Sequence, residues 1–81
     1  MNEEILTTLN KILPEVERVH GDHHPELHQV AALYAQLKEV PTKKIFQQLR
    51  QVTGDYTVPE NACPTYAKTY QLLAELDKAF G

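Results

Sequence analysis

Apolar residues recur at steps of three and four positions along most of the chain, and this spacing constrains the fold more than any other feature. The apolar stripes cover residues 5–19, 27–40, 45–52 and 66–80. Steps of three and four place side chains on one face of an α-helix, and no segment shows the apolar and polar alternation of a half-buried strand. The sequence therefore predicts an all-α domain, built as a small bundle of three or four helices.

Residues that cap or interrupt helices divide the first half of the chain. Asn2 has a side chain suited to an N-cap, so the first helix is expected to start there and to stop at Gly21. Pro14 lies inside this stretch, and a proline removes one backbone hydrogen bond and clashes with the preceding turn. We therefore expect a kink or a break at Pro14. The second helix is expected to begin at Pro25, capped by one of residues 22–24.

Similar signals divide the second half. Pro41 either ends the second helix or opens a third, because the residue before a proline is pushed away from helical geometry. The third helix is expected to run to Thr53 and to stop at Gly54. Residues 55–61 carry turn chemistry and predict a short ordered loop. The last helix is expected to begin near Pro64, since proline suits the first helical turn.

Length and charge narrow the class of protein. The 81 residues make one domain, near the size at which a single core is only marginally sufficient. The net charge is -3, without the clustered Lys and Arg that phosphate neutralisation requires, so nucleic acid is not the expected partner.

The ends of the sequence and its cysteine content indicate the compartment. No apolar run approaches the roughly 20 residues needed to span a bilayer, and the first residues are acidic where a signal peptide would be basic. The single cysteine, Cys63, has no internal disulfide partner, which fits a reducing compartment. These features predict a cytoplasmic protein without a membrane association.

All four histidines lie within residues 20–28, which read His-Gly-Asp-His-His-Pro-Glu-Leu-His. Histidine is the commonest metal ligand, and a spacing of four positions lets His24 and His28 share an ion on one helical face. His20 and His23 complete the site if the Gly21 turn folds back. The cluster predicts a site for iron or another transition metal. In the alternative interpretation, His24 caps the second helix and His28 is solvated.

The tyrosines and the cysteine each have two interpretations. Four tyrosines, Tyr34, Tyr56, Tyr66 and Tyr70, are candidates for radical or proton relay near a metal, but their spacing favours core positions whose hydroxyls reach the surface or a hydrogen-bond partner. Cys63 is either a reactive thiol at a helix N-terminus or a small apolar residue packed there, and packing is the favoured interpretation.

Two longer stretches carry a resemblance to a known family. The first reads Val-Glu-Arg-Val-His-Gly at 16–21 and His-Pro-Glu-Leu at 24–27. The second reads Leu-Arg-Gln-Val-Thr at 49–53 and Tyr-Thr-Val-Pro-Glu-Asn-Ala-Cys at 56–63, followed by Thr65, Tyr66 and Tyr70. Together these stretches resemble the RIC proteins, the hemerythrin-like di-iron proteins of iron–sulfur cluster repair after nitrosative or oxidative stress. The resemblance covers roughly residues 15–76.

The resemblance implies a four-helix bundle in which histidines and carboxylates from all four helices hold two irons, with His-x-x-x-Glu pairs on the second and last helices. This sequence contains no His-x-x-x-Glu pair. Aligned to the family, the first and last ligand histidines fall outside residues 1–81, and Glu39 stands about where the third helix has its histidine. Only His20 matches a histidine that the family keeps near the metals. The standard di-iron centre is therefore not expected here.

The same alignment places a deletion between Leu37 and Thr42. The second and third helices are therefore expected to form either two helices or one nearly continuous element kinked at Pro41. A shortened bundle would leave an apolar face open, and we expect a homodimer or a protein partner to cover it.

Three functions are compatible with these features. The favoured one is a small RIC-like accessory or binding protein, not an enzyme, that is connected with iron–sulfur cluster repair and captures metal weakly through its histidines. The second is a di-iron or other metal protein whose site is assembled across a homodimer, with Glu39, His20 and carboxylates such as Glu15 or Glu75 in place of the lost ligands. The third is a purely structural dimerisation module.

Overall fold

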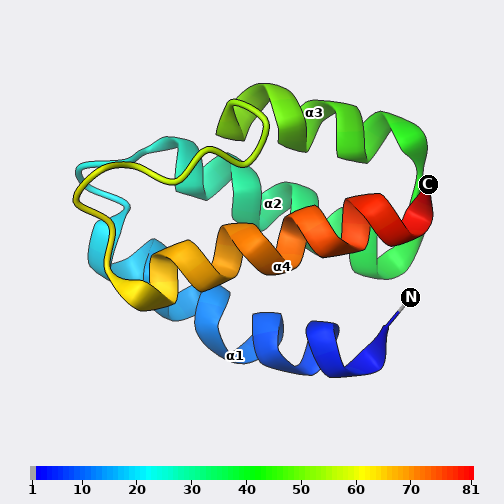
Figure 1. Cartoon of the computed structure of the whole chain (residues 1–81), viewed down its shortest axis with the longest axis horizontal. Helices are drawn as coiled ribbons and strands as arrows, with labels where there is room; N and C mark the ends of the chain where they lie inside the picture. The colour runs from blue at the N-terminus through cyan, green and yellow to red at the C-terminus, as the bar shows by residue number, and fades with distance from the viewer. Residues whose placement is uncertain (1) are drawn as a thin grey trace.

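The computed structural model describes residues 2–81, which form four helices: α1 (Glu3–His20), α2 (Glu26–Glu39), α3 (Lys43–Thr53) and α4 (Pro64–Phe80). Successive helices run in opposite directions, and both termini lie at the end of the bundle that also holds the turn between α2 and α3 (Figure 1). No strand occurs in the described part. The prediction of a small all-α bundle is confirmed, in its four-helix form.

Side-chain caps begin three of the four helices. Asn2 Oδ1 accepts hydrogen bonds from the backbone N–H groups of Glu4 and Ile5, and Thr42 Oγ1 accepts one from Ile45 N–H at 3.2 Å. At the start of α4, Cys63 is the N-cap and Pro64 follows it in the first turn. The predicted starts of α1 and α4 are therefore confirmed. The start of α2 differs from the prediction, because no side chain caps it.

The first helix passes through Pro14 without interruption. The expectation of a break there is wrong, and the reason is local. Proline supplies no N–H to the carbonyl group four residues earlier, at Asn10. Asn10 and Pro14 both lie on the exposed side of α1, where water can bond that carbonyl group.

The chain reverses direction between α2 and α3. Val40 and Thr42 have extended backbone conformations, with φ of -145° and -137°. α3 then packs back against α2. The alternative of one continuous element kinked at Pro41 is therefore wrong, because extended residues on both sides of the proline turn the chain through a tight hairpin.

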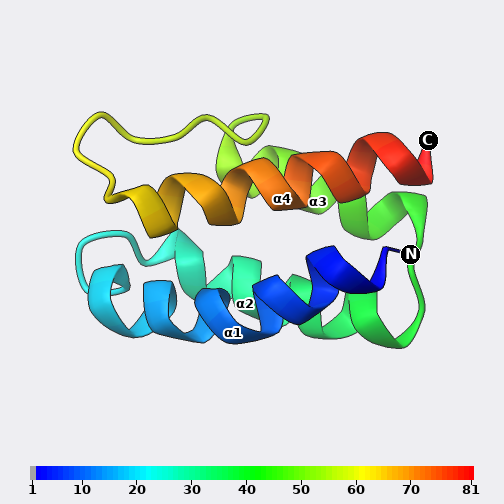
Figure 2. The same ribbon diagram turned by 60° about the horizontal axis from the view of Figure 1, so that its bottom comes forward.

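The core lies between the four helices. α1 packs against both α2 and α4, and α2 packs against α3. Figure 2 shows α1 and α2 as one layer of the bundle and α3 and α4 as the other. One buried cluster joins apolar residues of all four helices: Leu9, Leu13, Val16, Leu27, Val30, Leu33, Tyr34, Leu37, Ile45, Phe46, Leu49, Tyr66, Tyr70, Leu73 and Leu76. Val19, Val40 and Phe80 end their stripes and stay exposed. None of the helices within residues 2–81 is long and apolar enough to cross a membrane.

The link between α3 and α4 is held by Asp77. Gly54 ends α3 as predicted, with a left-handed φ of 61°, and Tyr56 keeps a φ of 62°, which is unfavourable for a residue with a Cβ. The Tyr56 hydroxyl donates to Asp77 Oδ2 at 2.8 Å. Arg50 donates to the same carboxylate through Nε at 2.7 Å and through Nη2 at 3.0 Å. One carboxylate on α4 therefore anchors both α3 and the loop that follows it.

The anchor makes the stability of the fold depend on pH. Hydrogen bonds from Arg50, and secondarily from Tyr56, hold the pKa of Asp77 below its ordinary 3.8, although partial burial acts in the opposite direction. A depressed carboxyl pKa adds stability above the unfolded-state pKa, and this contribution is lost as the pH falls through the folded-state pKa. We expect the free energy of unfolding to fall below about pH 4, more steeply in the wild type than in Asp77→Asn.

Urea unfolding at a series of pH values measures both slopes, and Asp77→Asn is expected to be the less stable protein at pH 7. Parallel pH profiles for the two proteins would show that Asp77 does not have this role.

Candidate functional site

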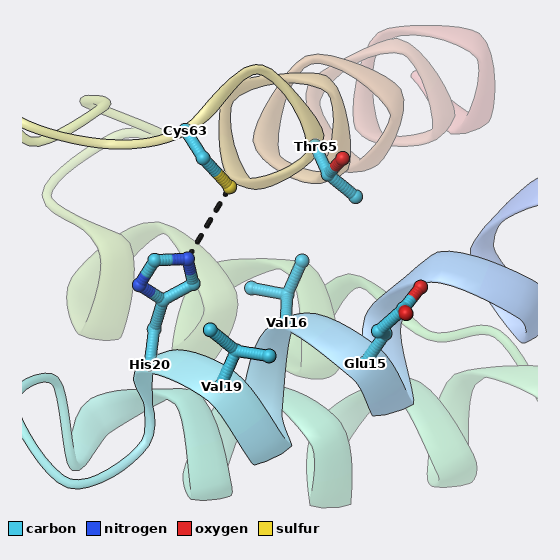
Figure 3. A pocket seen from close by; sticks show the side chains of 6 residues that line it. All are labelled: Glu15, Val16, Val19, His20, Cys63 and Thr65. Carbon is cyan, nitrogen blue, oxygen red and sulfur yellow. Dashed lines mark hydrogen bonds between the residues drawn. The ribbon is translucent and has the colours of Figure 1, made fainter.

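The end of α1 meets the start of α4 through two side chains that are 43 positions apart. His20 lies in the last turn of α1, and Cys63 is the N-cap of α4. His20 Nε2 and Cys63 Sγ are 3.2 Å apart, and the two side chains point toward one another (Figure 3). If the ring proton is on Nδ1, the thiol donates to Nε2. If it is on Nε2, the ring donates to the sulfur.

A hollow of about 220 Å³ adjoins this contact. Val16, Val19 and Glu15 line it from α1, and Thr65 faces them from α4 (Figure 3). Val19 exposes 55% of its surface beside this hollow. The hollow therefore combines a thiol, an imidazole and an apolar wall at one end of the bundle.

The ring of Tyr66 contacts two of the four histidines edge to face, one of them His20. The centroid distances are 5.3 Å to His20 and 5.4 Å to His24, and the ring of Tyr70 is 5.2 Å away. Tyr66 is fully buried, and within residues 2–81 its hydroxyl has no hydrogen-bond partner. Burial raises the pKa of Tyr66, while the Tyr70 hydroxyl, which is near but does not meet hydrogen-bond geometry with it, acts in the opposite direction. The expectation that the core tyrosine hydroxyls reach the surface or a partner is therefore not met at Tyr66.

The other three histidines of the predicted metal site have different polar neighbours from His20. His28 Nδ1 lies 2.8 Å from Glu17 Oε2, His24 Nδ1 lies 3.4 Å from Glu26 Oε2, and His23 is exposed. His24 precedes the helix, so His24 and His28 do not share a helical face. In the part of the chain that the structure describes, no three His, Cys, Asp or Glu side chains are placed to hold a metal ion. Metal binding by His20, His23, His24 and His28 stays a prediction.

Gly21 permits the turn between α1 and α2 for a steric reason. Its φ of -60° suits any residue, so its role is not the left-handed stop that is typical of glycine. A Cβ at this position would overlap the Glu17 carbonyl oxygen and lie 2.9 Å from His28 Cε1. The absence of a side chain lets the His28 ring lie against the end of α1.

Sequence reasoning missed two of the partners that define this site. Cys63 was expected to pack at the start of the last helix, and its place before Pro64 signals an N-cap, but nothing in the sequence pairs it with His20. Glu17 was not singled out as the partner of His28. Both contacts depend on how the helices are arranged.

The arrangement can support chemistry that needs a thiol beside a base, since a thiolate is the reactive form of cysteine. No family model matches the chain, and no solved structure matches it. The chemical interpretation of this end of the bundle therefore depends on its own geometry.

The unpartnered Tyr66 hydroxyl predicts an unusual effect of substitution. Tyr66→Phe removes a buried polar group without a partner and is expected to raise the free energy of unfolding by about 1 kcal/mol. Tyr34→Phe is the matched control, because the single Tyr34 hydroxyl proton has acceptors within reach, Asn10 Oδ1 at 2.8 Å and Leu6 O at 3.1 Å. It is expected to lower the free energy of unfolding by about 1 kcal/mol. Chemical denaturation of both variants measures the signs, and a loss of stability in Tyr66→Phe would contradict the assignment.

Metal analysis tests the histidine cluster. His28 and His24 each face a carboxylate, and no three potential ligands come together within residues 2–81, so we expect any metal to be held weakly and the freshly purified protein to carry far less than one ion per chain. The double variant His24→Ala, His28→Ala is expected to carry the same small amount. A stoichiometric ion that disappears in the double variant would instead establish the four-histidine site.

Proposed function

We propose that this protein is an RIC-like accessory protein of iron–sulfur cluster repair, which acts by binding a damaged iron–sulfur protein and not through a di-iron centre of its own. The observation that carries the proposal is that the two stretches that resemble the RIC proteins touch each other. They meet where His20 Nε2 lies 3.2 Å from Cys63 Sγ and where the Tyr66 ring contacts His24. A function is argued from such a site, since a fold alone does not specify one.

The residues present do not fit the di-iron centre that the resemblance implies. Such a centre in a helical bundle needs histidines and carboxylates that project inward from facing helices. The buried positions here carry Leu, Val, Ile, Phe and Tyr, with Thr53 and Thr69 as the buried polar residues among those described. No step of the proposed function therefore involves that centre.

The surface proposed for the partner is the junction of α1 and α4. Val19 belongs to the first resembling stretch and exposes an apolar side chain beside the hollow. Glu15 and Arg18, whose charged atoms are 3.8 Å apart, lie on the same part of α1 and are mostly exposed. An apolar centre with a polar rim is the usual composition of a protein interface.

Two matched variants test this surface. Val19→Lys places a charge on the junction. Val40→Lys makes the same change at another exposed valine, which follows the last turn of α2 and lies outside the junction. The binding partner in the test is a [4Fe–4S] dehydratase, compared in its intact and nitric-oxide-damaged forms by sedimentation velocity. We expect binding to the damaged form, about tenfold weaker with Val19→Lys and unchanged with Val40→Lys.

Equal affinity for the intact and damaged enzymes, or no binding to either, would overturn the proposal. Equal losses in the two variants would place the interface elsewhere. The homodimer expected from the sequence also stays a prediction, and the same sedimentation runs on the chain alone measure it.

A further inference from the structure

The end of the bundle that holds both termini carries an apolar surface that the proposed binding function does not use. Two large apolar residues stay exposed there, Val40 after α2 (63% exposed) and Phe80 in the last turn of α4 (39% exposed). A hollow of about 350 Å³ adjoins them, lined by Asn2, Pro41, Leu76, Ala79 and Phe80. An aromatic side chain at the centre of an exposed apolar patch is typical of protein interfaces.

Charges of opposite sign stand at two corners of this end face. α1 begins with Glu3 and Glu4, α3 begins with Lys43 and Lys44, and all four side chains are exposed. The two helices belong to different layers of the bundle, so the acidic and the basic pair lie apart on the same face (Figure 2). Within residues 2–81, none of these four side chains takes part in an ion pair. Both corners can therefore meet charges from another molecule.

The two lysines of α3 are placed unfavourably for their own helix. The N-terminal end of a helix carries a partial positive charge, which favours carboxylates and disfavours cations. The first turn of α1 is acidic, as this rule predicts, whereas the first turn of α3 holds Lys43 and Lys44 and no acidic residue. Carboxylates from a binding partner would offset this repulsion. A second copy of the chain presents two of them, at the start of its α1.

We propose that this end face binds the same face of a second copy of the chain across a two-fold axis. A two-fold interface pairs one patch with itself, so each contact between different residues occurs twice. With the axis perpendicular to the line that joins the starts of α1 and α3, Glu3 and Glu4 of each copy face Lys43 and Lys44 of the other. The ends of α4 then meet, and the Phe80 ring of each copy covers apolar surface of its partner.

Charge reversal tests this pairing, with sedimentation equilibrium of the whole chain as the readout. The double variant Glu3→Lys, Glu4→Lys is basic at both corners, and Lys43→Glu, Lys44→Glu is acidic at both. Each is expected to dimerise about tenfold more weakly than the wild type, because like charges face each other. Mixed in equal amounts, the two variants are expected to form a heterodimer with about the wild-type affinity, since each copy then faces the opposite charge. A variant that had merely lost its fold would not recover on mixing.

Two further variants test the apolar centre and the specificity of the charges. Ala79→Lys places a charge in the hollow and is expected to weaken the dimer about tenfold, whereas Ala32→Lys makes the same change at an exposed alanine midway along α2 and is expected to leave it unchanged. The control for charge reversal is Glu15→Lys, Glu60→Lys, at two exposed carboxylates outside the end face, which is expected to dimerise like the wild type.

A wild type that sediments as a monomer throughout the concentration series would overturn the proposal. So would reversed variants that dimerise like the wild type, or that stay monomeric when mixed. The result is independent of the proposed binding function, because the junction of α1 and α4 lies at the opposite end of the bundle and stays open in such a dimer (Figure 1). Loss of the dimer and loss of binding to the damaged enzyme are therefore separate outcomes.

Discussion

The packing of α1 against α4 is the interaction on which the rest of the structure depends. These helices come from opposite ends of the sequence, so bringing them together carries the largest loop-closure cost in the fold. Fully buried leucines on both helices, among them Leu9 and Leu73, offset that cost within one apolar cluster. The same packing brings His20 to Cys63 and forms the hollow beside them. The candidate site is therefore a product of the chain closure and not of any single motif.

The interior of the bundle and the end where α1 meets α4 differ in their polar side chains. Between the helices the buried residues are almost entirely apolar, which leaves little capacity to hold a charged cofactor there. Titratable side chains gather instead at the turn between α1 and α2, where His24 contacts Glu26 and His28 contacts Glu17. Tyr66 connects the two regions, because its ring contacts the histidines while its hydroxyl lies buried in the core. Binding and thiol chemistry are both compatible with this arrangement.

The sequence predicted what depends on local geometry. Asn2 and Gly54 mark helix ends because capping and left-handed turns are properties of a few neighbouring residues. Pro14 was harder, since whether a proline breaks a helix depends on whether water reaches the carbonyl group that it leaves without a donor. The partner of each histidine could not be predicted at all. The 3.2 Å contact between His20 and Cys63 depends on how the two helices are rotated relative to each other. The apolar stripes show which face of each helix is buried, but they do not fix this rotation.

The central claim is that the interior of this bundle is closed by apolar and aromatic side chains and that its reactive groups lie at the junction of α1 and α4. Diffraction from crystals of protein loaded anaerobically with iron, collected at the iron absorption edge, tests it most directly. The account predicts no anomalous peak between the four helices, with the His20 and Cys63 side chains in contact at the junction. Two bridged iron peaks inside the bundle, each with a full set of protein ligands, would contradict it.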